Sequence, residues 1–245
     1  MSGGWLCVAG LGPGDAALVT PQVQQAQEQA TDVLGYGPYL ARVPRRADQA
    51  HHASDNREEL ERARHGLRLA QAGRRVVIVS SGDPGVFAMA AAVFEAMEAE
   101  PAWQQLDVRV LPGVTAMLAA AARLGAPLGH DFCAINLSDN LKPWAVIERR
   151  LALAAQADLV LALYNPRSRS RPEGFARALA VLRQHCEPQR WVGLARAVFT
   201  PQESVQHLPL AQVQPDMADM RTLVIVGSRA TRTVGRYLYT PRRAD

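Results

Sequence analysis

The chain has 245 residues, of which 48% are hydrophobic, and a formal net charge of +4. This length suffices for one large domain or two small ones. No run of about eighteen apolar residues occurs, which argues against a membrane span. Met1–Gly4 lacks a basic segment, which argues against a signal peptide. The three cysteines form no CxxC pair, which argues against an iron–sulfur or zinc site, and the net charge is too small to argue for nucleic-acid binding. Few, scattered cysteines indicate a cytoplasmic protein.

Apolar runs alternate with helical patterns along the chain. Runs at residues 76–79, 159–163 and 223–226 are typical of strands buried on both faces, as in a mostly parallel sheet. Helices are predicted over residues 54–72, 87–99, 114–123 and 173–185. The alternation predicts an α/β protein, with an N-terminal α/β lobe over 1–113 and a C-terminal α/β lobe over 114–245. The polar tail at 231–245 is expected to fray.

Two glycine-rich turns follow apolar runs, and glycine lets a ligand approach the backbone. The first, Gly10-Leu11-Gly12-Pro13-Gly14-Asp15, is neither a dinucleotide fingerprint nor a phosphate-binding loop: its third glycine comes early, Pro13 lacks a donor, and no Lys-Ser/Thr follows. The second contains Gly82-Asp83-Pro84, where Asp83 binds a ligand, caps a helix that begins near Pro84, or does both.

Two further segments carry candidate binding residues. In the turn 111–116, Thr115 and Ala116 are small enough to admit a ligand ring, although a simple helix cap fits equally. The segment Tyr164-Asn165-Pro166 precedes Arg167, Arg169 and Arg171, which either bind a polycarboxylate or lie on a solvated loop. The residues His130, Asp131 and His185 are acid–base candidates, but such lone residues are more often structural.

These motifs, in this order, resemble the tetrapyrrole methyltransferase family. The resemblance covers residues 5–232 and is sharpest toward members that methylate C17 of precorrin-3B. It is carried by 34–39, by 54–58, by 80–90, by 124–132 and by 163–168. Relatives acting on uroporphyrinogen have a Tyr-Asp pair after the first helix, whereas this chain has Tyr36-Gly37.

The resemblance implies two α/β lobes holding S-adenosylmethionine in the cleft between them, and a homodimer. It implies methyl transfer to C17 of precorrin-3B with ring contraction to precorrin-4, in cobalamin biosynthesis. The implied cofactor contacts are Pro13, Gly82, Asp83, Val86, Thr115, Ala116, Asn165, Ala195, Thr222 and Leu223. Ring contraction needs a proton-transfer group; the candidates are Asp83, Asp15, His130 and Tyr36. Arginines would pair with the acetate and propionate groups of the substrate; the candidates are Arg42, Arg57, Arg167, Arg169 and Arg171.

Other interpretations remain open at this point. The substrate could be cobalt-factor III of the anaerobic route, or this could be another methyltransferase of the same fold. A basic RNA-binding protein would bind RNA with steep salt dependence and would not bind S-adenosylmethionine. A nicotinamide dehydrogenase is disfavoured by the failed fingerprint.

Overall fold

The computed structural model describes residues 3–243, and the chain divides into two compact units, Met1–Thr115 and Ala116–Asp245. Each unit contains a five-stranded sheet, and the second also contains a small three-stranded sheet. Helices alternate with strands in both units, so the predicted α/β class is confirmed. Among the residues described, no helix has the length and apolar character needed to cross a bilayer.

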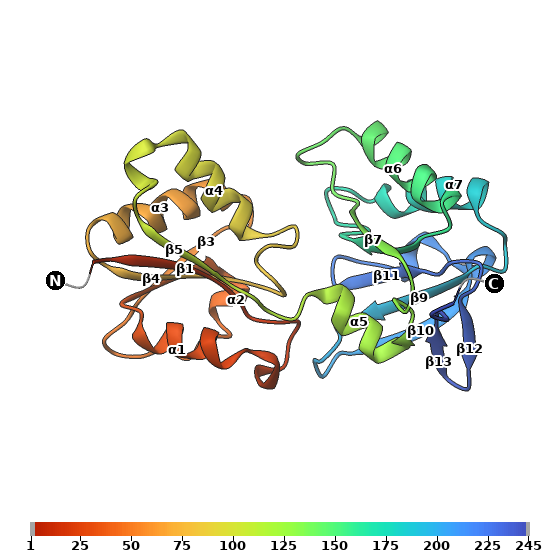
Figure 1. Ribbon diagram of the computed structural model, residues 1–245, viewed down its shortest axis with the longest axis horizontal. Coiled ribbons are helices and arrows are strands. Elements are labelled where there is room, and N and C mark those ends of the chain that lie inside the picture. Colours follow the sequence, from red (N-terminus) through yellow and green to blue (C-terminus); the bar gives the residue numbers. More distant parts are fainter. Residues whose placement is uncertain (1–2, 244–245) are drawn as a thin grey trace. The chain divides into compact units, whose positions relative to one another are not determined.

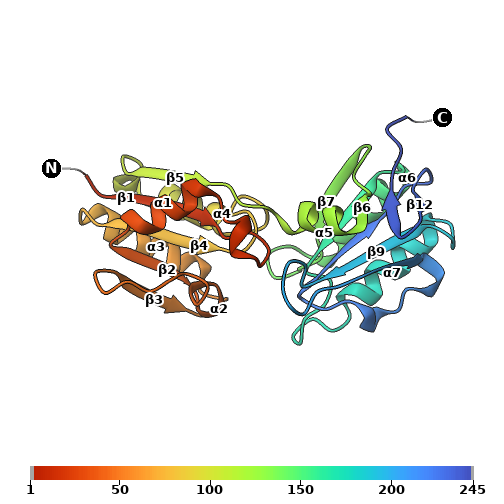
Figure 2. The same ribbon diagram turned by 90° about the horizontal axis from the view of Figure 1, so that it is seen from below.

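The sheet of the N-terminal unit is entirely parallel, in the order β3-β2-β4-β1-β5 (Figure 2). Its strands are β1 (Trp5–Gly10), β2 (Asp32–Tyr36), β3 (Ala50–Ser54), β4 (Arg75–Ser80) and β5 (Asp107–Leu111). Its helices are α1 (Pro21–Gln29), α2 (Gly37–Leu40), α3 (Glu59–Gln71) and α4 (Met89–Ala99), with 3₁₀ turns at Ala16–Leu18 and Pro101–Trp103.

Two helical layers cover this sheet, one on each face (Figure 1). Successive side chains of a strand point to opposite faces. In β1, Leu6 and Val8 pack in one core cluster with residues of α3 and α4, whereas Cys7 and Ala9 pack with residues of α1 in another. Both faces of β1 and β4 are therefore buried, which explains why their sequences are continuously apolar.

The larger sheet of the C-terminal unit is mostly antiparallel, in the order β10-β9-β11-β8-β7. Only β7 and β8 pair in parallel. The prediction of a mostly parallel sheet is therefore wrong for residues 223–226, because β11 pairs antiparallel with both of its neighbours, and it holds for residues 159–163 only on the side of β8 that faces β7. Burial on both faces produces an apolar run whatever the strand direction. The strands are β7 (Phe132–Asn136), β8 (Val160–Tyr164), β9 (Trp191–Arg196), β10 (Ser204–Pro209) and β11 (Thr222–Val226).

Helices α6 and α7 share a core cluster with this sheet, and α5 packs against β9, β10 and β11. These helices are α5 (Ala116–Leu124), α6 (Trp144–Gln156) and α7 (Gly174–His185), and 3₁₀ turns lie at Leu210–Gln212 and Pro215–Met217. A Cβ on Gly193 of β9 would lie 2.6 Å from Leu124, so the glycine lets α5 approach the sheet closely.

The tail at 231–243 is folded, so the prediction of fraying is wrong for these residues, while 244–245 lie outside the described part. Strands β12 (Arg232–Val234) and β13 (Tyr237–Tyr239) form a hairpin, and β13 pairs with β6 (Gly125–Ala126). Leu238 is fully buried, and the Thr240 hydroxyl donates to the Pro127 carbonyl at 2.6 Å. The buried Leu238 side chain and the hydrogen bonds of the buried Thr231 and Thr240 hydroxyls keep this segment folded, although its polar composition indicated solvent exposure.

All four predicted helices begin later than expected, by one to five residues, and the first two show why. Residue Ser54 ends β3, and α3 begins at Glu59 after a turn in which the Glu58 amide donates to the Asp55 carbonyl. Helix α4 begins at Met89, because Phe87 has a φ of 53°, which no α-helix accommodates. The interpretation of Asp83 as the cap of a helix near Pro84 is therefore wrong.

Candidate functional site

Three strand ends meet at the carboxyl edge of the N-terminal sheet. A Cβ on Gly113, after β5, would lie 2.2 Å from the Gly82 carbonyl oxygen, and a Cβ on Gly10 would lie 2.6 Å from the same oxygen. These distances exclude any side chain at positions 10 and 113. The chain's own backbone fills this space, so glycine at positions 10 and 113 allows the strand ends to approach one another closely.

The first turn is joined to the second by a short backbone bridge. The Gly12 amide donates to the Gly82 carbonyl at 3.1 Å, and the Gly82 amide donates to the Gly12 carbonyl at 3.0 Å. Both glycines have a φ of +64°, which other residues rarely adopt. Pro13 follows the bridge and is half-buried, and Asp15 caps the next 3₁₀ turn by accepting from the Ala17 amide at 2.9 Å.

Asp83 joins the second turn to the third. One carboxylate oxygen accepts from the Gly85 amide at 2.8 Å, and the other accepts from the Gly113 amide at 3.1 Å. A carboxylate oxygen can accept more than one hydrogen bond, so these contacts leave acceptor capacity for a ligand donor. Val86 lies three residues further along the same loop and is half-buried.

The turns after β1 and β4 lie at the point where the strand order of the sheet reverses: from β1 the chain continues to β2 on one side, and from β4 it continues to β5 on the other. After β1 the chain enters α1 on one face, and after β4 it enters α4 on the other (Figure 1). In parallel α/β sheets, ligands bind outside the carboxyl ends of strands at such a point. The candidates Pro13, Gly82, Asp83 and Val86 all lie on these two turns. Thr115 follows β5 and is buried.

The candidates of the C-terminal unit gather at one edge of its sheet. Register places Tyr164, at the end of β8, beside Asn136 of β7. In the antiparallel strands, Leu223 pairs with Ala195, and Thr222 starts β11 at the edge where β9 ends. Ala195, Thr222 and Leu223 are buried.

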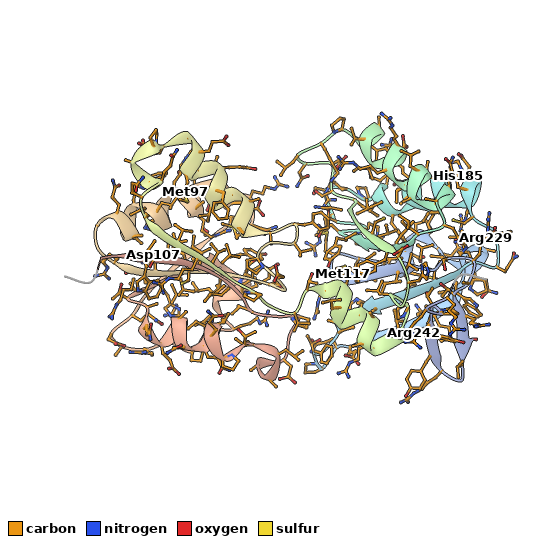
Figure 3. The ribbon with its side chains drawn as sticks, viewed as in Figure 1. Met97, Asp107, Met117, His185, Arg229 and Arg242 are labelled. Atoms are coloured by element: carbon orange, nitrogen blue, oxygen red, sulfur yellow. The ribbon has the colours of Figure 1, made fainter. Side chains whose placement is uncertain are left out.

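Tyr164 fixes the start of α5 at this edge. Its hydroxyl accepts from the backbone amide of Met117 at 3.1 Å. Met117 lies near the start of α5, where Figure 3 labels it. The next residue, Asn165, has a φ of +54° and donates through its side-chain amide to Asn136 at 3.0 Å. Ala116, the first residue of α5, therefore lies at the edge that carries Asn165.

The acid–base candidates differ in position. His130 precedes β7, so it lies at the end of that strand opposite Asn136 and away from the other candidates of its unit; it is 3.8 Å from the Asp131 carboxylate. Asp15 serves as a cap, and Asp83 holds two amides. Tyr36 ends β2 at the carboxyl edge of the N-terminal sheet and meets the Tyr39 ring edge-on at 5.3 Å.

The five candidate arginines also have different surroundings. Arg42 donates to backbone carbonyls of the first glycine turn, and Arg167 donates through Nε to the Ala218 carbonyl at 3.0 Å. Arg57 and Arg169 are exposed. In Arg171, Nε and one terminal nitrogen are buried without a hydrogen-bond partner among the described residues, and the Asp139 carboxylate lies 3.9 Å from Nε.

Sequence reasoning missed Asn136 and Gly113. Asn136 accepts from both Asn165 and the Ser138 amide. The signal that could have identified Asn136 is that it is a polar residue at the end of an apolar segment. Gly113 was visible in the third turn, but its contact with Asp83, thirty residues away, was not. Within residues 3–243, no group of three or more His, Cys, Asp or Glu side chains is arranged to hold a metal ion.

Comparison with known proteins gives concordant matches over nearly the whole chain. Residues 6–214 match the family described as tetrapyrrole (corrin/porphyrin) methylases. A precorrin-3B C(17)-methyltransferase from Sinorhizobium sp. is 53% identical, over 98% of this chain and 96% of that protein. The crystal structure of the methyltransferase CobJ superposes with a TM-score of 0.96 at 59% identity, covering 97% of this chain and all of that one.

A more distant structure was determined with a ligand. The uroporphyrin-III C-methyltransferase from Thermus thermophilus, complexed with S-adenosyl homocysteine, superposes with a TM-score of 0.68 at 25% identity, covering 91% of this chain and 97% of that one.

Proposed function

We propose that this chain, which belongs to the tetrapyrrole (corrin/porphyrin) methylase family, transfers a methyl group to C17 of precorrin-3B with ring contraction to precorrin-4, in cobalamin biosynthesis. The observation that carries this proposal is the 53% identity to a precorrin-3B C(17)-methyltransferase along almost the full length of both chains.

S-adenosylmethionine is the methyl donor of tetrapyrrole methylases and supplies an electrophilic methyl group on a sulfonium. The N-terminal unit offers a site for this donor, because the turns after β1 and β4 lie on either side of the point where the strand order reverses, and Pro13, Asp83 and Val86 are only partly buried there. We assign Pro13, Gly82, Asp83 and Val86 to donor binding here. The spare acceptor capacity of Asp83 suits a donor hydroxyl or amine.

Six more residues are assigned to donor binding: Thr115, Ala116, Asn165, Ala195, Thr222 and Leu223. Small side chains at 115, 116 and 195 leave room for a ligand. The Asn165 amide is fixed by Asn136, so a contact with it would be made by a group already held in place. Orientation of the reactants then supplies much of the rate, because an electron-rich ring carbon attacks the methyl group without a covalent intermediate on the protein.

Ring contraction requires proton transfer, and Tyr36 is the favoured candidate. It lies at the carboxyl edge of its sheet, whereas Asp15 is used as a cap and His130 lies at the far end of β7. For the substrate carboxylates, Arg171 is favoured by its buried donors without partners, and Arg57, Arg167 and Arg169 are further candidates.

The protein is further proposed to be a cytoplasmic homodimer. Its cysteines Cys7, Cys133 and Cys186 are all free, which suits a reducing compartment. Light scattering coupled to size exclusion tests the dimer.

The experiment that tests this function supplies S-adenosylmethionine together with either metal-free precorrin-3B or cobalt-factor III and follows the absorption spectrum. Turnover of precorrin-3B with the spectral change of ring contraction supports the proposal. Turnover of cobalt-factor III alone assigns the protein to the anaerobic route. Tight binding of the methyl donor without turnover of either leaves the family assignment standing and refutes the substrate.

A further inference from the structure

Arg42 lies just after α2, yet its side chain reaches the first glycine turn about thirty residues earlier in the chain. One terminal nitrogen donates to the Leu11 carbonyl at 2.6 Å and to the Gly14 carbonyl at 3.3 Å. The other donates to the Gly12 carbonyl at 3.2 Å. A single planar guanidinium thus holds three carbonyl groups within four residues.

These contacts fix the orientation of one peptide plane from both sides. In a trans peptide the carbonyl and the amide point in opposite directions. The Leu11 carbonyl accepts from Arg42, and the amide of the same peptide, on Gly12, donates to the Gly82 carbonyl at 3.1 Å. The peptide cannot rotate without breaking one of these bonds. The following carbonyl, on Gly12, is also held by Arg42, and it sets the direction in which Pro13 projects.

The charge of Arg42 is balanced by these carbonyl dipoles rather than by a carboxylate. Among the described residues, no acidic side chain forms an ion pair with it. Burial lowers the pKa of its guanidinium, although the nearby Tyr39 opposes this shift. Arginine at this position therefore bears a desolvation cost, and three charge-assisted hydrogen bonds offset it.

We propose that Arg42 is a positioning residue for methyl-donor binding: it holds the turn Leu11–Gly14 in the conformation that presents Pro13, and it does not bind the tetrapyrrole. This inference rests on the proposed function, because the ligand of the turn is taken to be the methyl donor. It also reassigns Arg42, whose guanidinium is engaged by the protein's own backbone, from the substrate-binding set.

The test compares three variants with the wild type. Arg42→Met removes the charge and all donors at similar size, and Arg42→Lys keeps the charge but loses the planar fork. Arg45→Met is the matched control, because Arg45 is an exposed arginine of the same loop. Each protein is examined by hydrogen exchange of the peptide covering residues 10–15 without ligand, by calorimetric titration with S-adenosyl homocysteine, and by the KM for precorrin-3B.

We expect Arg42→Met to accelerate exchange of the turn and to weaken S-adenosyl homocysteine binding about tenfold, which corresponds to about 1.4 kcal/mol. Arg42→Lys should recover part of both, and Arg45→Met should match the wild type. The KM for precorrin-3B should not change. If Arg42→Met does not fold, Arg42→Lys carries the same comparison.

Wild-type affinity in the Arg42 variants contradicts the inference, as does a raised KM for precorrin-3B with intact S-adenosyl homocysteine binding, which would make Arg42 a substrate ligand. A wild-type protein that does not bind S-adenosyl homocysteine refutes the proposed function instead. In that case the exchange comparison still decides whether Arg42 holds the turn.

Discussion

The carboxylate of Asp83 accepts a hydrogen bond from the Gly113 amide at 3.1 Å, and so ties the loop after β4 to the turn after β5. Its second oxygen holds the Gly85 amide at 2.8 Å. One acidic side chain therefore shapes both loops at the carboxyl edge of the sheet. Its assignment to donor binding consequently has two components, a direct contact and the positioning of neighbouring backbone.

Replacing Asp83 with Ala should weaken S-adenosyl homocysteine binding by about tenfold or more, because two amides lose their acceptor and the loop loses its shape. Asp83→Asn keeps one acceptor oxygen and should retain part of the affinity. The exposed Asp48, which pairs with Arg46, provides the control Asp48→Ala. Calorimetry that finds Asp83→Ala equal to the wild type would remove Asp83 from the donor site.

Gly113→Ala should lower the free energy of unfolding by about 2 kcal/mol, because its Cβ would overlap the Gly82 carbonyl oxygen and force the backbone apart. Gly37→Ala is the matched control, since a Cβ there meets no atom within 4 Å. Urea unfolding measures both. Equal stability of the two variants would contradict the close crossing of the strand ends.

Arg171→Met should raise the KM for the tetrapyrrole several-fold while S-adenosyl homocysteine affinity stays at the wild-type value, because two of its guanidinium nitrogens have no hydrogen-bond partner among the described residues and would bind a substrate carboxylate. Arg150→Met, an exposed position on α6, controls for the loss of one positive charge. Steady-state kinetics and calorimetry together decide this point. Loss of S-adenosyl homocysteine affinity in Arg171→Met would contradict the assignment of Arg171 to substrate binding and would assign it to binding of the methyl donor.

The buried carboxylate of Asp32 should make stability depend on acid pH. Burial alone would raise the pKa of Asp32, but hydrogen bonds from Arg74, Thr31 and His52 outweigh it and hold the pKa below its ordinary value. A carboxylate with a depressed folded-state pKa stabilises the fold above its unfolded pKa of about 3.9, and this contribution is lost as the pH falls through the folded value.

Asp32→Asn should therefore lower the free energy of unfolding by about 2 kcal/mol at pH 7, and the difference from the wild type should shrink below about pH 4. Asp107→Asn, in an exposed pair with Arg109, should change stability by less than about 0.5 kcal/mol. Urea unfolding at pH 7 and pH 3 measures both variants. A difference that is independent of pH would show that ionisation of Asp32 contributes nothing.

The features that could be predicted are those determined by residues close together in the sequence. The glycine turns after β1 and β4 and the run of β8 were identified because burial and turn geometry leave local patterns. The direction of the strands could not be predicted, since a strand buried on both faces has the same apolar sequence in a parallel and in an antiparallel sheet. The hairpin at Arg232–Tyr239 was missed because one buried leucine does not outweigh a polar composition.

Long-range contacts of the site left no such pattern. The sequence makes Arg42 a candidate for binding substrate carboxylates, but its hydrogen-bond partners lie 28 to 31 residues earlier in the chain. Likewise, Asn136 and Asn165 are 29 residues apart. Such contacts follow from the order and pairing of the strands, which propensities of single segments do not determine.

The most direct test of the central claim uses S-adenosylmethionine labelled with ¹³C in its methyl group, with metal-free precorrin-3B as acceptor. Mass spectrometry and NMR of the product locate the label. The proposed function predicts one labelled methyl group on C17 of a ring-contracted product. A label on another carbon, or none despite tight binding of S-adenosyl homocysteine, would contradict the assignment of precorrin-3B C17 as the site of methylation.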